Sequence, residues 1–299
     1  MKTPKVRLLH ELLCLIVAAS FSAAAFGQTV APAKQGKAGI DDVVTVQHDS
    51  KLLKRSVSYR VILPNKYKND SARYAVIYLL HGLFGHFDNW TTKTGVPEYA
   101  ESYNFIIVTP EGGDGWYTDS ATVPNDKYES YIVQELIPEI DKKYRTLADR
   151  KHRFIAGLSM GGYGAIKFGL KYPDMFLLVG SFSGALDAPL RLEDNKNLRP
   201  SIVSVFGPNG SQTRKDNDIF RLLRDASPDA LKHIPYVYMA CGTEDFLFQT
   251  NRDFDNLLIE KKVLHEYRER PGAHEWVFWD GQVQEFLRVA DKMIQPTPL

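Results

Sequence analysis

The pentapeptide Gly-Leu-Ser-Met-Gly at residues 157–161 is the part of this chain with the clearest chemical meaning. A short apolar segment, 153–158, leads into it, and a segment with helical character, 163–172, follows. A strand, a sharp turn and a helix in this order hold a serine hydroxyl clear of its own backbone, as nucleophilic catalysis requires. The two glycines lack the Cβ atoms that would collide in so tight a turn. The pattern therefore predicts Ser159 as the nucleophile of an acyl-transfer reaction.

A nucleophilic serine needs a base and a carboxylate that orients this base. In sheets of parallel strands both should follow later strands, in the order serine, acid, histidine. Asp245 comes shortly after the apolar segment 236–241, and His274 comes shortly after segment 265–270, in a Gly-Ala-His turn. We therefore predict Asp245 as the acid and His274 as the general base. Glu244 is the alternative carboxylate, and Asp245 could also cap the helix that follows it.

The negative oxygen that forms during acyl transfer needs two backbone N–H donors at about 3 Å. Met160 directly follows the nucleophile, at the start of a helix whose first N–H groups are free. Leu83 lies in the loop after the apolar segment 74–80, so we predict its N–H as the second donor. No metal or other cofactor is expected, because His81 and His86 lack a third ligand and match no metal motif.

Alternating strands and helices must position these residues. The expected strands are 43–48, 57–63, 74–80, 105–109, 153–158, 177–183, 236–241 and 265–270, and the expected helices are 96–103, 128–144, 163–172, 246–262 and 276–294. The first two strands should be antiparallel and lie at the sheet edge, and Pro138 should kink or restart its helix. From residue 74 onward the alternation is typical of a doubly wound, mostly parallel α/β sheet with helices on both faces. The polar stretch 185–233 is expected to be an insertion over the strand ends that could act as a lid.

The composition is that of an ordinary globular chain. The 299 residues are 44% hydrophobic and 24% charged, with no internal repeat, so we expect one catalytic domain at residues 43–299. The net charge of +1 gives no reason to expect a nucleic-acid partner. The oligomeric state is left open.

The N-terminus has the pattern of an export signal. Basic residues precede the apolar run 12–19, and small residues lead to a cleavage site after residue 27, with a second option after residue 25. The run is short for a membrane anchor, and two serines interrupt the apolar residues beyond it. We therefore expect a signal peptide at 1–27, a flexible leader at 28–42 and a secreted or periplasmic protein without a stable membrane anchor. Cys241 would then be the only cysteine, so a disulfide within the chain is excluded.

Four motifs together resemble those of one esterase family. They are Tyr78-Leu79-Leu80-His81-Gly82-Leu83, Gly157-Leu158-Ser159-Met160-Gly161-Gly162, Cys241-Gly242-Thr243-Glu244-Asp245 and Gly272-Ala273-His274-Glu275-Trp276. This family groups S-formylglutathione hydrolase (esterase D), feruloyl and acetyl-xylan esterases, tributyrin-type esterases and the mycobacterial mycolyltransferases. The resemblance extends over about residues 57–294. It implies an α/β-hydrolase fold, a triad of Ser159, Asp245 and His274, and an oxyanion hole of Leu83 and Met160.

Four aromatic residues come from loops that should border the serine: Trp90, Trp116, Tyr117 and Trp276. Aromatic walls of this kind could hold a sugar ring or a hydroxycinnamoyl group, although such large side chains could also simply pack the loops. No cluster of arginines lies beside the motifs, so the sequence offers no clamp for an anionic substrate.

These observations predict a secreted serine esterase that acts on short-chain acyl or hydroxycinnamoyl (feruloyl or acetyl) esters of carbohydrates. The expected partner is therefore a small-molecule or carbohydrate ester. Three alternatives remain. An acyltransferase of the mycolyltransferase type would use the same triad with an alcohol in place of water, and a thioesterase would resemble S-formylglutathione hydrolase. A non-catalytic binding module is disfavoured because no member of the triad is missing.

Overall fold

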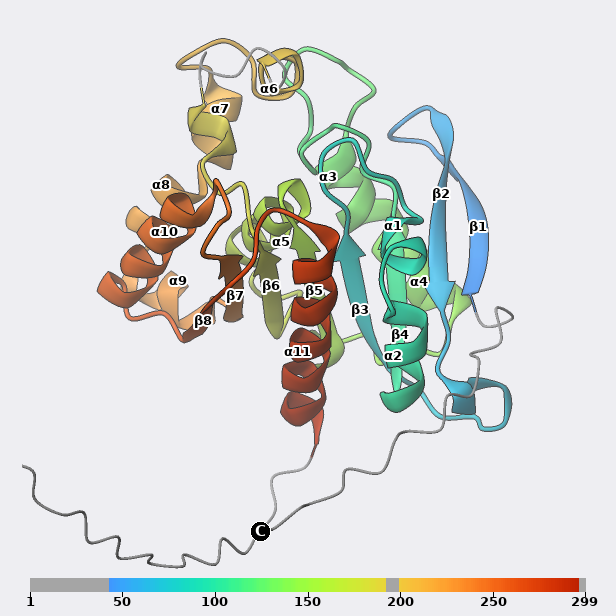
Figure 1. Ribbon diagram of the computed structural model, residues 1–299. Coiled ribbons are helices and arrows are strands. Elements are labelled where there is room, and N and C mark those ends of the chain that lie inside the picture. Colours follow the sequence, from blue (N-terminus) through green and yellow to red (C-terminus); the bar gives the residue numbers. More distant parts are fainter. Residues whose placement is uncertain (1–42, 192–198, 296–299) are drawn as a thin grey trace, which may run out of the picture. The chain divides into compact units, whose positions relative to one another are not determined.

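The computed structural model describes residues 43–191 and 199–295 (Figure 1). The predicted signal peptide at 1–27 and leader at 28–42 lie outside these residues. Within them, eight strands form one sheet in the order β1-β2-β4-β3-β5-β6-β7-β8. The strands are β1 (Val43–Ser50), β2 (Arg55–Ile62), β3 (Ala75–Leu80), β4 (Phe105–Pro110), β5 (Arg153–Leu158), β6 (Leu178–Phe182), β7 (Tyr236–Gly242) and β8 (His265–Arg270). Each expected strand is present, with ends that shift by at most two residues.

The direction of the strands follows their composition. β1 is exposed or half-buried except for its last residue, whereas β2 alternates buried and half-buried residues from Val57 to Val61. The two strands pair antiparallel, and β2 pairs antiparallel with β4. β3, β4 and β5 are buried along their whole length, as expected of parallel strands covered on both faces. All pairs from β4 to β8 are parallel. The predicted mostly parallel sheet with an antiparallel edge is therefore confirmed.

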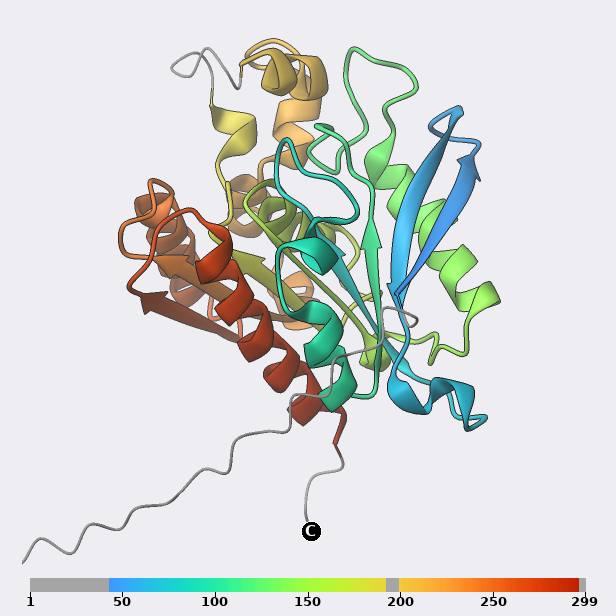
Figure 2. The same ribbon diagram turned by 45° about the vertical axis from the view of Figure 1, so that its right-hand side comes forward.

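Helices cover both faces of the sheet (Figures 1 and 2). One face carries α1 (Asn89–Thr92), α2 (Val96–Ser102) and α11 (Trp276–Ile294), and the other carries α3 (Tyr128–Ser130), η3 (Tyr131–Leu136), α4 (Ile137–Lys143), α5 (Met160–Lys171), α8 (Ile219–Arg224) and α10 (Phe248–Glu260). Along β3 successive side chains join opposite layers: Ile77 packs with α2 and α11, whereas Tyr78 packs with α5. The alternation of side chains along the strand thus divides one apolar run between two hydrophobic cores, one on each face of the sheet.

The helix expected over 128–144 changes its hydrogen-bond pattern just before Pro138. It consists of α3, the π-helix η3 and then α4, in which Pro138 is the second residue. Proline has no N–H to donate to the preceding turn, so it is tolerated at the start of a helix and not in its interior. The π turn before Pro138 accommodates the missing donor, and the backbone angles at Leu136 and Ile137 stay helical, so the helix continues through this point without the break that a restart would require.

In the polar stretch 185–233, the described residues 185–191 and 199–233 form four helices besides α8: η5 (Ala188–Leu190), α6 (Arg199–Phe206), α7 (Gln212–Asn217) and α9 (Pro228–His233). α6 and α7 lie beyond the carboxyl ends of the strands (Figure 1). The buried Arg214 guanidinium ties two parts of this insertion together, since it donates to the carbonyl of Pro189 at 2.6 Å and to that of Gly207 at 3.0 Å.

A buried ion pair fixes α5 to the α3 region. Lys167 Nζ lies 2.7 Å from Glu129 Oε2, and it also donates to the Tyr117 carbonyl at 2.5 Å. Both side chains are buried. Burial alone would raise the pKa of Glu129, but the ammonium groups of Lys167 and Lys171 lower it to about 2, so the carboxylate is ionised at neutral pH.

The variant Lys167→Met should therefore lower the free energy of unfolding by about 3 kcal/mol, because it removes one of the two ammonium groups that are paired with the buried Glu129 carboxylate. Urea titration followed by circular dichroism measures this change. The double variant Lys167→Met/Glu129→Leu removes both charges and should recover part of the loss. A double variant less stable than the single one would contradict this account.

Candidate active site

Ser159 occupies the turn between β5 and α5. Its φ of 52° and ψ of −114° lie in a region that residues other than glycine rarely adopt. Two backbone hydrogen bonds hold it there: Ser159 N–H donates to the Phe182 carbonyl at 2.9 Å, and Ala185 N–H donates to the Ser159 carbonyl at 3.0 Å. A Cβ atom on Gly161 would collide with the carbonyls that end β3. The tight turn expected from the pentapeptide is therefore present, and it requires that glycine.

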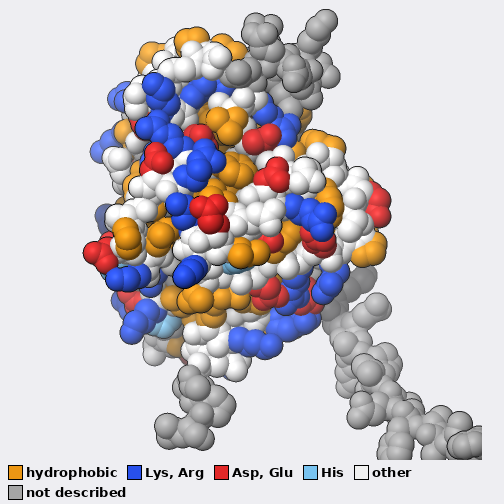
Figure 3. Space-filling model, turned by 90° about the vertical axis from the view of Figure 1, so that its left-hand side faces the viewer, with side chains coloured by type: hydrophobic (Ala, Val, Ile, Leu, Met, Phe, Trp, Pro, Cys, Tyr) orange, Lys and Arg blue, Asp and Glu red, His pale blue; other side chains and the backbone are white. Residues whose placement is uncertain are grey.

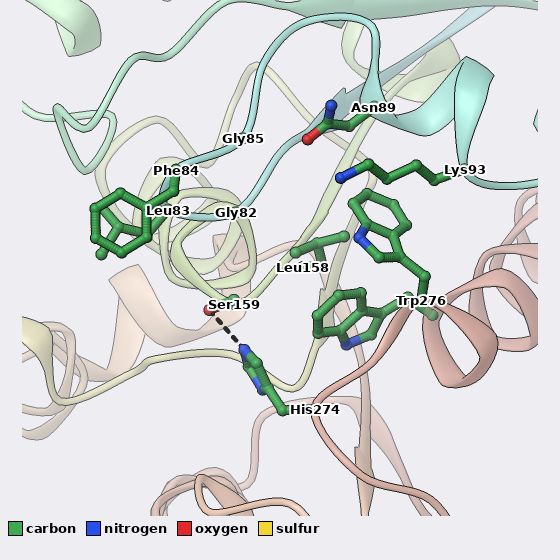
Figure 4. Close-up of a pocket in the computed structure, with 11 residues that line it drawn as sticks. Gly82, Leu83, Phe84, Gly85, Asn89, Lys93, Leu158, Ser159, His274 and Trp276 are labelled. Atoms are coloured by element: carbon green, nitrogen blue, oxygen red, sulfur yellow. Dashed lines mark hydrogen bonds between the residues drawn. The ribbon is translucent and has the colours of Figure 1, made fainter.

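His274 connects the serine to a carboxylate. Its Nε2 lies 3.1 Å from Ser159 Oγ (Figure 4). Its Nδ1 lies 2.9 Å from Asp245 Oδ2. The imidazole packs against two aromatic rings: its ring centroid lies 4.9 Å from that of Trp279 and 4.7 Å from that of Phe246. Residues from three separate strand ends, β5, β7 and β8, thus form one line of hydrogen-bonded side chains.

The Asp245 side chain is completely buried and accepts two hydrogen bonds. Oδ1 accepts from the Leu247 backbone N–H at 2.8 Å, and Oδ2 faces His274. Burial alone would raise the pKa of Asp245, but these hydrogen bonds outweigh it and hold the pKa below its usual value. The Asp245 side chain is therefore a carboxylate at neutral pH, and it can accept a hydrogen bond from an imidazole N–H.

The neighbouring Glu244 carboxylate bonds to the loop backbone and to Thr243, not to His274. Glu244 is exposed, and its carboxylate accepts hydrogen bonds from the Gly272 N–H and from Thr243 Oγ1, while its own N–H donates to the Gly272 carbonyl at 3.0 Å. The backbone N–H of Gly272 lowers the pKa of Glu244. Glu244 thus braces the loop that carries His274, and of the two carboxylates it is Asp245 that contacts the imidazole.

The two predicted oxyanion donors, Leu83 and Met160, belong to the segments that meet at the serine: Met160 directly follows Ser159, and Leu83 lines both cavities that Ser159 lines. Met160 is the first residue of α5, and Leu83 follows Gly82 in the loop after β3. The Gly82 carbonyl is held by His81 Nδ1 at 2.8 Å and by the Gly85 N–H at 3.0 Å. Because the Gly82 carbonyl and the Leu83 N–H belong to one planar peptide unit, these bonds also fix the direction of that N–H.

Two cavities open beside Ser159, and they share the walls formed by Leu83, Phe84 and His274. The first, called here the Trp116 pocket, has a volume of about 220 Å³, and its other lining residues are Trp116, Ala185, Arg191, Phe246 and Leu247. The second, called here the Trp276 pocket, has a volume of about 150 Å³, and its other lining residues are Gly82, Gly85, Asn89, Lys93, Leu158, Trp276 and Trp279. The Trp116 pocket is thus mainly apolar, and the Trp276 pocket is more polar.

The structure divides the four predicted aromatic walls into two groups. Trp116 and Trp276 line the two pockets. Trp90 and Tyr117 line neither of them and are fully buried, so the prediction that they border the substrate is wrong for these two residues. Each of them donates instead to the end of β3, Trp90 Nε1 to the Leu80 carbonyl at 3.0 Å and the Tyr117 hydroxyl to the His81 carbonyl at 3.1 Å. They support the loop that carries Leu83.

Sequence reasoning missed several residues that line these pockets. Trp279 lies nearly one helical turn after Trp276, and Phe246 directly follows Asp245, so both were within reach of the motifs. Phe84 has a φ of 59° and is 67% exposed, and no sequence signal marks so unusual a conformation for an aromatic residue. Lys93 lies outside all four motifs. It supplies a cation beside the serine where none was expected.

No group of three or more His, Cys, Asp or Glu side chains able to hold a metal ion occurs within residues 43–191 and 199–295. No helix within the same ranges is long and apolar enough to cross a membrane.

A mostly parallel sheet with helices on both faces and a serine at a sharp turn between strand and helix define the α/β-hydrolase class. Residues 50–288 match the family described as "Putative esterase", so the chain belongs to this esterase family, as its motifs suggested. An acetyl esterase of Caldicellulosiruptor saccharolyticus is 32% identical over 254 residues, which cover 81% of this chain and 95% of that relative.

Solved structures agree with this assignment. A ferulic acid esterase matches with a TM-score of 0.74 and 29% identity, over 85% of this chain and 98% of its own. FphF, a fluorophosphonate-binding serine hydrolase of Staphylococcus aureus, matches with a TM-score of 0.75 and 27% identity, over 83% of this chain and 97% of its own. The chain is therefore a serine esterase, a carboxylic ester hydrolase.

Proposed function

We propose that this esterase acts through Ser159, His274 and Asp245 on short-chain acyl or hydroxycinnamoyl esters of carbohydrates. The observation that carries the proposal is the line of hydrogen bonds from the buried Asp245 carboxylate through His274 to Ser159 Oγ, at 2.9 and 3.1 Å. This line ends between two pockets, which offers separate places for the acyl part and the alcohol part of an ester.

The reaction begins when Ser159 Oγ attacks the ester carbonyl carbon and its proton passes to His274 Nε2. Asp245 accepts from His274 Nδ1 and stabilises the imidazolium that results. The carbonyl oxygen becomes negative and accepts hydrogen bonds from the N–H groups of Leu83 and Met160. His274 then gives its proton to the departing alcohol oxygen, which leaves an acyl-enzyme on Ser159. Water attacks this ester with His274 again as base, and the carboxylic acid departs.

The nature of the acyl group follows from the Trp116 pocket. Its walls are mainly apolar and aromatic, and they include Trp116 and the strongly exposed Phe246. A flat aromatic acyl group can pack against such walls, and an acetyl group can enter without contacting them all. The names of the acetyl esterase and ferulic acid esterase relatives support the same two acyl classes.

We place this activity outside the cytoplasm. The proposal rests on the basic and apolar N-terminal pattern of residues 1–27. Cys241, the only cysteine beyond that segment, is buried and free, so the described fold needs no disulfide. N-terminal sequencing of the protein recovered from the cell exterior or periplasm of a bacterial host tests the cleavage at residue 27.

A substrate panel tests the proposed chemistry. p-Nitrophenyl acetate, methyl ferulate and acetylated xylan should all be hydrolysed, and S-formylglutathione should react more slowly than the oxygen esters. A strong preference for the thioester would favour the formylglutathione-type alternative. Mass spectrometry of products formed with an added sugar acceptor should detect free acid, and acylated acceptor as the main product would identify a transferase.

A further inference from the structure

The Trp276 pocket contains a cationic group that the proposed reaction does not use. Lys93 caps the carboxyl end of α1, and its ammonium nitrogen lies 5.1 Å from the centroid of the Trp276 ring. Figure 4 shows the Lys93 side chain reaching into the space between Asn89 and Trp276, and Lys93 lines the same pocket as Ser159. The aromatic face thus holds a positive charge at the wall of the pocket.

The carboxylates near this lysine have other partners. Asp88 Oδ1 accepts from Asn89 Nδ2 at 3.1 Å. Asp280 accepts from the Gly95 N–H at 2.8 Å and from the Tyr99 hydroxyl at 2.7 Å. Within residues 43–191 and 199–295, no carboxylate lies within 4.0 Å of Lys93 Nζ. The charge in this pocket therefore remains available to a ligand.

The Trp116 pocket differs in this respect. Its cation, Arg191, is paired with Asp187, with Nε and Oδ1 2.7 Å apart. The two pockets beside Ser159 thus differ in charge as well as in polarity: one offers apolar walls and a neutralised arginine, and the other offers an aromatic ring and a free ammonium group. An ester with a charged alcohol part would be complementary to this pair of pockets.

We infer that the Trp276 pocket binds the alcohol part of the substrate and that Lys93 favours alcohols carrying a carboxylate, such as the sugar acids of acidic polysaccharides. A sugar ring can pack its C–H groups on Trp276 while its carboxylate pairs with Lys93. The inference rests on the proposed function, because it takes Ser159 as the reacting group. It also replaces the expectation that the site has no clamp for an anion.

The test uses two acetyl esters that differ only in the charge of the alcohol part, 4-acetoxybenzoate and 4-acetoxybenzamide. For each protein the measured quantity is the ratio of kcat/KM for the anionic ester to kcat/KM for the neutral ester. Lys93→Gln should lower this ratio about fivefold, the upper range for an exposed ion pair, and Lys93→Arg should keep it. In the wild type 0.5 M NaCl should also lower this ratio, because salt screens exposed charges.

Lys66→Gln is the matched control. Lys66 lies on an exposed 3-10 helix distant in sequence, so this variant should leave the ratio unchanged.

The possible results distinguish a failure of the inference about Lys93 from a failure of the proposed function. An unchanged ratio in Lys93→Gln, with both esters still hydrolysed in a Ser159-dependent way, would overturn the inference and leave the proposed function intact. A preference for charge on the acyl side, measured with mono-p-nitrophenyl succinate against p-nitrophenyl butyrate, would also overturn it, since the pocket assignment would be reversed. Failure of the wild type to hydrolyse either acetyl ester would overturn the proposed function and this inference together.

Discussion

Ser159→Ala should lower kcat/KM for p-nitrophenyl acetate by about 10⁴-fold or more, because no acyl-enzyme can form without the hydroxyl. The fold should survive. Alanine keeps the Cβ atom that the backbone at φ 52° already accommodates, and the hydrogen bonds that hold this turn are made by main-chain atoms. Initial rates measure the loss, and thermal unfolding checks the structure. Ser56→Ala, an exposed serine on β2, is the matched control and should retain full activity.

A second measurement identifies the reacting atom directly. A fluorophosphonate should label the wild type once, on the peptide that contains Ser159, and it should not label Ser159→Ala. Mass spectrometry locates the label. If the folded alanine variant kept more than about one tenth of the wild-type rate, or if the label were found on another serine, Ser159 would not be the nucleophile.

The fold could be predicted because its signals are local. Apolar runs such as 75–80 are bounded by turns, and buried parallel strands need that composition. The placement of Asp245 and His274 followed from the same property, since parallel strands bring their carboxyl ends to one edge of the sheet. The place where the helix changes its hydrogen-bond pattern, at Pro138, was predictable as well, because the missing N–H acts at one known position.

The lining of the pockets could not be predicted in the same way. Trp116 and Tyr117 are adjacent, and both have a positive φ, of 51° and 49°, a conformation that their residue types do not indicate. One ring consequently reaches a pocket while the other is buried under the loop. Lys93 reaches its pocket from the carboxyl end of a helix of four residues, which is too short to give a hydrophobic period. Such side-chain directions depend on the packing of distant segments.

Asp245→Asn should lower kcat/KM by about 10⁴-fold, whereas Glu244→Gln should lower it by about tenfold or less. The geometry gives the reason. The Leu247 N–H donates to Oδ1, so an asparagine at this position will keep its carbonyl oxygen there and turn its NH₂ group toward His274. The imidazole must then accept at Nδ1 and carry its proton on Nε2, where it can no longer take the proton of Ser159.

Glu244 does not impose a tautomer on the imidazole, because its carboxylate bonds to the backbone of Gly272 and to Thr243. Glutamine can keep the acceptor that the Gly272 N–H requires, so the loop should hold and only the exposed hydrogen bond to the charged group is weakened. Rates of both variants on p-nitrophenyl acetate, with unfolding curves as the check on structure, compare the two carboxylates. If Glu244→Gln lost as much activity as Asp245→Asn, the loop brace and not the buried carboxylate would determine the orientation of His274.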